Sequence, residues 1–275
     1  MKNRASNMRN LLWAVGILLC LVAMLVGLIF AMSQKNTGNR LDGTLVLGHI
    51  ERGEKPVDVD LAGLESTTGK LIPVPETKKG NLEDVFGMTF LIDKTLSGLR
   101  NYVTNYGDGV NVQIWTDDGS GLMAKSAAES PIVFVDGSLI TPSNAAMVTR
   151  PRSVVLFLGG DGLADTTEQE FVDGYTRLIN SIREASPDTN IIVCSIGSIS
   201  SNYQGGDGLS PQLIASANAW IRQICTNTGA YYADIASIVN DEYGFLSDEF
   251  LTPDGRSIAA AGIALIVDYF RHHYL

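Results

Sequence analysis

The feature that most constrains this chain is a short apolar run at residues 154–158, which ends abruptly in Gly159-Gly160-Asp161-Gly162. A continuous run of β-branched and large apolar residues is typical of a strand buried on both faces of a parallel sheet. The carboxyl end of such a strand opens onto the crevice where α/β proteins bind ligands. The run therefore predicts a central strand that delivers polar groups to a site, although an ordinary glycine-rich turn fits this stretch as well.

Strand and helix patterns alternate from about residue 82 onward. The predicted strands lie at residues 88–92, 112–115, 132–135, 138–140, 154–158, 190–196 and 231–233. The predicted helices lie at residues 96–103, 141–148, from a cap at Thr166 or Thr167 to Ser186, 211–228 and 258–269. Asp136-Gly137 indicates a hairpin turn. Strands that alternate with helices predict a parallel sheet with helices on both faces, which is a three-layer α/β/α domain.

Residues 11–32 form an apolar run without a charged side chain. A helix of this length would span roughly 33 Å, enough to cross the hydrocarbon core of a bilayer. More basic residues precede the run than follow it, which places residues 1–10 in the cytoplasm and the C-terminal part outside. A cleaved signal peptide is the alternative, but its apolar core would be shorter. We predict a single-pass cell-membrane protein with an extracytoplasmic C-terminal domain.

Charge and cysteine content exclude several kinds of site. All thirty Asp and Glu residues lie after residue 40, together with fifteen of the twenty Lys and Arg residues, so this part carries a net charge of −15. Such an acidic body repels a phosphate backbone, and we predict no nucleic-acid binding. Cys194 and Cys225 fall in a predicted strand and a predicted helix, where we expect unpaired thiols. Because no Cys–His cluster has ligand spacing, we predict no metal site and no cofactor.

These patterns divide the chain into a cytoplasmic tail (1–10), a transmembrane anchor (11–32), a stalk or arm (33–81) and a folded domain (82–275). The stalk is polar and rich in Gly, Pro, Thr and Lys, without a helical period. Its short apolar pieces, which include residues 71–74, are candidates to dock in extended form on the folded domain.

Three polar turns lie at element ends in a fixed order: Asp93-Lys94-Thr95, Gly159-Gly160-Asp161 and residues 252–257. Their surroundings, TFLIDKTLSGLRNY, VVLFLGGDGL and LTPDGRSIAAAGIALIVDYF, resemble the GDS, G-x-N-D and D-G-x-H blocks of the SGNH/GDSL hydrolases. This superfamily contains lipases, esterases and carbohydrate deacetylases. The resemblance covers about residues 82–275 and is closest to the membrane-anchored, Gram-positive branch. It implies a flavodoxin-like fold with a parallel sheet.

The site positions depart from that family. In its members the GDS serine attacks an acyl carbon, the last-block histidine takes the proton, and an aspartate orients the histidine. Here Lys94 and Ser257 stand at the serine and histidine positions, and Asp161 replaces the asparagine that donates to the oxyanion. Only Asp93 and Asp254 match the pattern. An ammonium is no nucleophile. A carboxylate repels a developing oxyanion, whereas a hydrogen-bond donor at this position would stabilise it by about 3–4 kcal/mol. The replacements therefore predict a pseudoenzyme.

Three interpretations of the altered crevice remain open. Lys94 and Asp161 could face each other in an ion pair that closes the old pocket. The crevice could instead bind an envelope glycan, an acylated polymer or a peptide. Residual chemistry would use Thr95, a deprotonated Lys94 or a metal held by carboxylates. The candidate binding residues are Thr95, Gly119, Gly121, Gly160 and Asn202.

We therefore predict a membrane-anchored, extracytoplasmic, SGNH-hydrolase-like protein that acts by binding a cell-envelope ligand. The alternative is an active esterase or deacetylase that acts on acylated envelope polysaccharide. A third possibility is a structural partner in a membrane-protein complex, with the anchor, the arm and the loop 200–210 as its surfaces.

Overall fold

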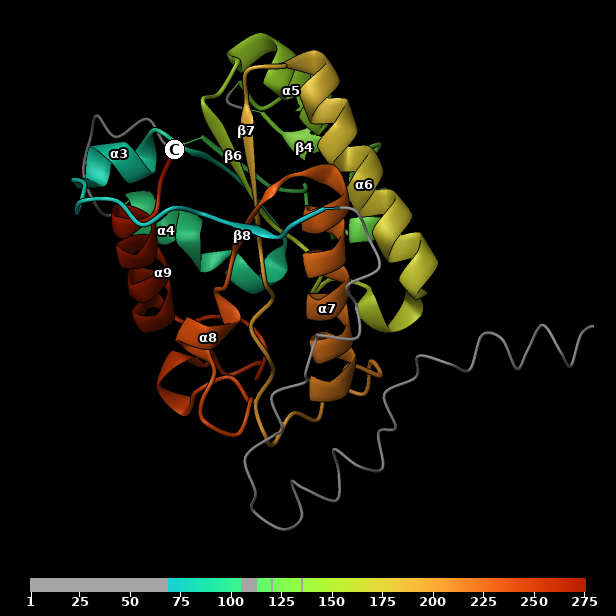
Figure 1. Cartoon of the computed structure of the whole chain (residues 1–275). Helices are drawn as coiled ribbons and strands as arrows, with labels where there is room; N and C mark the ends of the chain where they lie inside the picture. Colours follow the sequence, from blue (N-terminus) through green and yellow to red (C-terminus); the bar gives the residue numbers. More distant parts are fainter. Residues whose placement is uncertain (1–68, 105–112, 120, 135) are drawn as a thin grey trace, which may run out of the picture. The chain divides into compact units, whose positions relative to one another are not determined.

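The computed structural model describes residues 69–104, 113–119, 121–134 and 136–275 (Figure 1). The predicted cytoplasmic tail, the membrane anchor and most of the stalk lie outside the described residues. Within the described ranges, no helix combines the length and the apolar character that a bilayer crossing requires.

A six-stranded sheet organises the folded domain, and every neighbouring pair of strands runs parallel. Its order is β1 (Ile72–Pro73), β8 (Tyr231–Ala233), β7 (Asn190–Cys194), β6 (Ser153–Phe157), β2 (Thr89–Ile92) and β3 (Gln113–Trp115). Without β1, this is the flavodoxin-like order, in which the chain reverses its winding direction between β2 and β6. The predicted central strand is β6.

Helices cover both faces of the sheet (Figure 1). One face carries α5 (Pro142–Thr149), α6 (Glu168–Ala185) and α7 (Pro211–Thr228); the other carries α3 (Leu82–Phe86), α4 (Gly98–Thr104), α8 (Ala236–Val239) and α9 (Ala260–His272). Successive residues of β6 enter opposite cores: Val154 and Leu156 pack in the α6 layer, whereas Val155 and Phe157 pack in the α9 layer. The predicted three-layer α/β/α architecture is confirmed.

A short antiparallel hairpin lies beside the main sheet, as the Asp136-Gly137 turn predicts. It consists of β4 (Ile132–Val133) and β5 (Leu139–Ile140), and the chain then continues directly into α5. The predicted cap of α5 is also found, because the Thr141 hydroxyl accepts a hydrogen bond from the backbone N–H of Asn144.

Local sequence signals explain where the long helices begin and end. Thr167 and Glu170 form a capping box at the start of α6, so Thr167 rather than Thr166 is the cap. Ser210 caps α7, which ends at Gly229 in the left-handed conformation. α9 begins at Ala260 rather than at Ile258, since the Ile258 N–H donates to the Thr95 carbonyl at 2.9 Å and holds that residue in the preceding turn.

The described end of the predicted stalk, from Gly69 onward, packs on the sheet. Ile72 and Pro73 pair with Tyr231 and Tyr232 as edge strand β1, and Val74 is buried. Residues 71–74 thus dock as an extended segment, one of the outcomes considered for this piece of the stalk.

Cys194 and Cys225 are free and buried. They belong to the cores on opposite faces of the sheet, which explains why they do not pair. Burial raises the pKa of the Cys225 thiol to about 12, so this group is unreactive near neutral pH.

The capping box predicts a measurable loss of stability. Thr167→Ala leaves the Glu170 N–H without its side-chain acceptor and lowers the free energy of unfolding by about 1 kcal/mol in urea titrations. Ser216→Ala is the matched control, because the Ser216 hydroxyl bonds the Gln212 carbonyl inside α7 and caps nothing. Equal losses in the two variants would contradict the capping role.

Candidate functional site

The candidate site lies where the winding of the sheet reverses. Asp93 follows β2 and Gly159 to Asp161 follow β6, and these two strands are neighbours with Ile92 opposite Phe157. The third turn, residues 252–257, reaches the same place through the hydrogen bond between Ile258 and Thr95. The structure thus brings together the three polar turns that the sequence singles out.

The carboxylate of Asp93 joins the ends of the two strands. Its side chain is 1% exposed. One oxygen accepts hydrogen bonds from the Thr95 N–H at 2.9 Å and the Thr95 hydroxyl at 2.5 Å. The other accepts from the backbone N–H groups of Gly159 at 2.9 Å, Gly160 at 2.8 Å and Asp161 at 3.4 Å. Asp93 therefore holds the turn after β6 in place from within the protein.

Burial and the nearby carboxylate of Asp161 raise the pKa of Asp93 to about 6. The hydrogen bonds from Thr95 and Gly160 act in the opposite direction but do not outweigh them. Asp93 and Thr95 both face the interior, and Thr95 is only 6% exposed. Neither is placed to contact a ligand.

Asp161 turns its carboxylate toward donors that an anion in the crevice would need. One oxygen accepts from the backbone N–H groups of Lys94 at 3.3 Å and Leu122 at 3.4 Å. The other pairs with the Arg256 guanidinium at 3.1 Å. The protein's own anion thus occupies a position with converging donors.

The partner of Asp161 differs from the expected one. Arg256, not Lys94, forms its ion pair, and the same guanidinium bonds the Gly160 carbonyl at 3.2 Å and the Asp207 carboxylate at 3.3 Å. Among the described residues, the Lys94 ammonium forms no ion pair, and its side chain is exposed. Arg256 forms this ion pair because its long side chain extends from the third turn to Asp161, where the planar guanidinium donates to the carboxylate.

Ser257 and Asp254 form a closed local turn. The Ser257 hydroxyl donates to one oxygen of Asp254 at 2.5 Å, and the other oxygen accepts from the Thr252 hydroxyl at 2.6 Å. Burial raises the pKa of Asp254, but these two hydrogen bonds, with the N–H groups of Arg256 and Ser257, outweigh it and lower the pKa to about 2. A hydroxyl that donates to an ionised carboxylate is no proton acceptor.

Neither of the two described histidines belongs to the three polar turns. His272 and His273 lie at the end of α9, where His273 stacks on Tyr269 and bonds the Tyr269 carbonyl at 2.9 Å. In the part of the chain that the structure describes, no group of His, Cys, Asp or Glu side chains could hold a metal ion.

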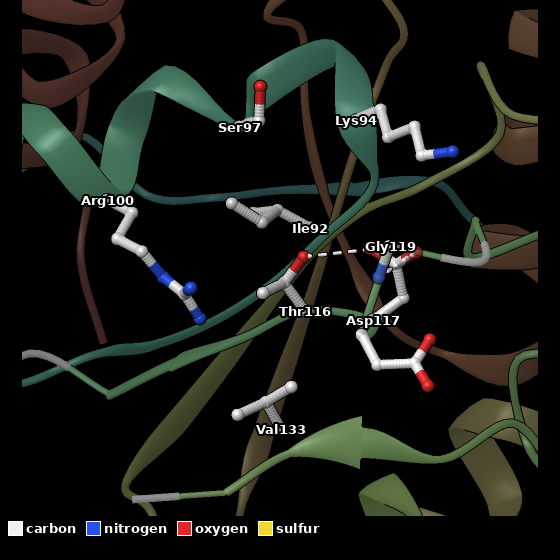
Figure 2. Close-up of a pocket in the computed structure, with 9 residues that line it drawn as sticks. Ile92, Lys94, Ser97, Arg100, Thr116, Asp117, Gly119 and Val133 are labelled. Atoms are coloured by element: carbon white, nitrogen blue, oxygen red, sulfur yellow. Dashed lines mark hydrogen bonds between the residues drawn. The ribbon is translucent and has the colours of Figure 1, made fainter. Parts of the chain in front are cut away.

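A cavity of about 370 Å³ opens beside Lys94 (Figure 2). Figure 2 shows Lys94, Ser97 and Arg100 on one wall and Thr116, Asp117 and Gly119 on the other, with Ile92 and Val133 between or below them. The wall formed by residues 116–119 is held by Asp117, which accepts hydrogen bonds from the Gly119 and Gly121 N–H groups.

The predicted binding residues take different places. Gly119 lines the cavity, and Gly121 lies beside it, where an added Cβ would be 3.7 Å from both Lys94 Nζ and Asp161 Oδ2. Gly160 is buried, and a Cβ there would lie 2.4 Å from a Thr95 methyl group. Asn202 is exposed, and its N–H bonds the Ser200 hydroxyl within its own loop.

Sequence reasoning missed the group around Arg256. Asp207 accepts hydrogen bonds from Arg256 and from the Tyr203 hydroxyl, so the loop 200–210 is tied to the candidate site. The family pattern leaves the position of Arg256 unspecified, and the distance in sequence to Asp161 hides their contact. The one available signal was a basic residue inside the third polar turn.

Comparison with known proteins agrees with this fold. Residues 123–257 match the GDSL-like Lipase/Acylhydrolase family. The matched segment contains Asp161 and ends at Ser257; it does not include the turn with Lys94. No curated protein matches the sequence.

Solved structures with similar architecture share little sequence with this chain. A provisionally assigned platelet activating factor from Streptococcus pneumonia has 15% identity and a TM-score of 0.48, covering 89% of this chain and 99% of its own. The lipopolysaccharide acetyltransferase periplasmic domain of Salmonella ser. Paratyphi A has 17% identity and a TM-score of 0.46, and the match covers 70% of this chain and 82% of that domain. A GDSL-like lipase from Bacteroides thetaiotaomicron has 13% identity and a TM-score of 0.46, and the match covers 71% of this chain and 90% of the lipase.

The raised pKa of Asp93 predicts a pH dependence. Its folded pKa of about 6 exceeds the ordinary value of 3.8, so between these values the folded protein binds a proton that the unfolded chain has released. The contribution of Asp93 to stability therefore falls as pH rises through this range. Urea unfolding at about pH 4 and about pH 7 should show the wild-type protein losing stability relative to Asp93→Asn, which cannot titrate. A difference that moves the other way would mean that the hydrogen bonds hold this pKa low.

Proposed function

We propose that this domain, an α/β domain of the SGNH/GDSL-hydrolase type, binds an acylated or otherwise modified envelope glycan without hydrolysing it. The observation that carries the proposal is the position of Asp161. Its carboxylate accepts hydrogen bonds from the N–H groups of Lys94 and Leu122, which follow β2 and β3, and Arg256 holds it there by an ion pair. Acyl transfer at this place would require a second anion to form against it.

Lys94, Thr95 and Ser257 are not equipped to attack an acyl carbon. Lys94 is exposed, and an ammonium has no free electron pair with which to attack. Thr95 is buried and donates its hydroxyl hydrogen to Asp93. Ser257 donates to Asp254, whose lowered pKa makes it a poor proton acceptor. The usual pairing of a nucleophile with a nearby base is therefore not formed by these groups.

The site is also poorly equipped to stabilise the oxyanion of acyl transfer. A preorganised donor at such a position lowers the barrier of acyl transfer by about 3–4 kcal/mol. Here the N–H groups of Lys94 and Leu122 already bond the Asp161 carboxylate. A tetrahedral intermediate would have to displace that carboxylate from Arg256 and from both N–H groups.

The cavity beside Lys94 supports binding. Its volume of about 370 Å³ lies within the range of small-ligand pockets. Ile92 and Val133 provide apolar surface, while the Lys94 ammonium provides a donor for ligand oxygens. Apolar surface with a placed donor suits a sugar ring or an acyl substituent.

The location proposed for the domain rests on the sequence. The run 11–32 has the length and composition of a transmembrane anchor, and the charge bias around it favours an extracytoplasmic domain. A domain tethered to the outer side of a cell membrane meets envelope polymers or membrane-protein partners. The match to an acylhydrolase family supports the rival function, an active esterase or deacetylase on the same polymers.

Turnover separates the two functions. We expect the purified full chain in detergent to hydrolyse 4-nitrophenyl acetate no faster than the Lys94→Ala and Thr95→Ala variants, because neither side chain can attack the ester. A wild-type rate that one of these substitutions abolishes would establish the esterase and refute the binding proposal.

Binding is tested with purified peptidoglycan sacculi, either native or treated with base to remove ester-linked acyl groups. The full chain should co-sediment with native sacculi, and Lys94→Glu should weaken this by about tenfold or more, since it replaces donors with a carboxylate at the cavity. Lys78→Glu is the control. It makes the same charge change at an exposed lysine next to Thr77, which bonds the end of α9. Equal losses in both variants would indicate unspecific charge effects, and absence of co-sedimentation would contradict this ligand class.

A further inference from the structure

A second surface of the domain combines exposed apolar and basic side chains. Met147 and Val148, in the last turn of α5, are 54% and 66% exposed, the two most exposed large apolar side chains among the described residues. Arg150 and Arg152, directly after the helix, are exposed as well. We call these four residues the α5 patch.

The guanidinium groups of the α5 patch are available to an external partner. Neither Arg150 nor Arg152 forms a side-chain hydrogen bond or an ion pair with the described residues. Lys70 adds another exposed positive charge near the described start of the chain, while Asp188 is an exposed acid on the turn that contacts Pro151. The α5 patch therefore presents two positive charges beside the exposed acid Asp188, although the chain after residue 40 carries a net charge of −15.

The α5 patch lies at the edge of the sheet where the strands begin. α5 leads into the start of β6, and the Asn190 N–H at the start of β7 donates to the Arg152 carbonyl at 3.0 Å. The chain arrives at the same edge: Gly69 lies against the Thr226 carbonyl near the end of α7 and leads into β1. Figure 1 shows α5, the start of β7 and this end of α7 in the same upper part of the view.

We propose that the α5 patch docks on the surface of an anionic phospholipid bilayer. Met147 and Val148 would enter the interfacial region, and Arg150 and Arg152 would pair with lipid phosphates. This rests on the membrane anchor of the proposed function and goes beyond it, because it assigns the orientation of the domain. Charge complementarity and the arrival of the tethered chain at this edge both favour lipid over a second protein copy.

The tether makes a small patch sufficient. Two arginines and two apolar side chains would give only weak membrane binding to a free domain. The 36 residues between the apolar run 11–32 and Gly69 span at most about 130 Å. A tether of this kind gives an effective concentration on the order of a millimolar. A contact that is weak in solution is then populated.

Docking in this orientation directs the candidate site away from the bilayer. Lys94, Asp161 and the cavity lie at the carboxyl ends of the strands, opposite the edge that carries the α5 patch. The crevice would open toward the cell wall. A polymer of the wall, rather than a membrane lipid, would therefore reach it.

The test uses the full chain with Cys20→Ser, inserted at one copy per nanodisc. The nanodiscs contain one part phosphatidylglycerol to two parts phosphatidylcholine, with doxyl-labelled lipid as the quencher. An environment-sensitive fluorophore is attached at Val148→Cys or, as control, at Tyr243→Cys, an exposed position in the turn after α8 at the opposite edge. We expect lipid quenching about threefold or more stronger at position 148, with loss of this excess when Arg150 and Arg152 are both replaced by Gln.

The outcomes distinguish the proposals from each other. Equal quenching at positions 148 and 243 in an inserted chain overturns the docking proposal and leaves the binding function untouched. An excess that persists in the double Gln variant, or in nanodiscs of pure phosphatidylcholine, overturns recognition of anionic lipid. A chain that does not insert into the nanodisc overturns the anchor and the docking together, whereas co-sedimentation with sacculi tests the ligand class independently.

Discussion

The buried carboxylate of Asp93 is the interaction on which this structure depends. Asp93 follows β2, and its carboxylate accepts hydrogen bonds from the N–H groups of the turn after the neighbouring strand β6. One side chain therefore connects the ends of the two central strands. Those N–H groups have no partner from the sheet ladder, and leaving buried donors unpaired would be costly. The same arrangement fixes the backbone of Gly159, Gly160 and Asp161, and thereby the shape of the crevice.

A fixed backbone does not determine the chemistry of the crevice. Asp161 sits on the turn that Asp93 holds, and its carboxylate is kept in the crevice by Arg256. Arg256 in turn contacts Asp207, so that a loop distant in sequence closes over the same point. The scaffold that favours ligand binding at the switch point is retained, while the groups at its centre neutralise one another. This is why we favour binding at the adjacent cavity over acyl transfer at the centre.

The sequence predicts the layers of this fold well and its contacts less well. The apolar run of β6, the cap at Thr141 and the Asp136-Gly137 turn are local signals, and each appears as expected; of the two caps considered for α6, Thr167 is the one found. Because parallel strands end at one edge of the sheet, the sequence also predicts Asp93 and Asp161 in one crevice. The partner of Asp161 could not be predicted, because side-chain reach across the crevice depends on how the third turn folds back, and no periodicity encodes that.

The central claim is that no side chain among the described residues of the three polar turns acts as an activated nucleophile. Treatment of the full chain with a fluorophosphonate, followed by intact-mass and peptide analysis, tests it most directly, since such reagents phosphonylate an activated hydroxyl. The account predicts an unmodified chain near neutral pH. A stoichiometric adduct on Thr95 or Ser257 would contradict it, because it would show a nucleophile and a base working together at the end of the sheet.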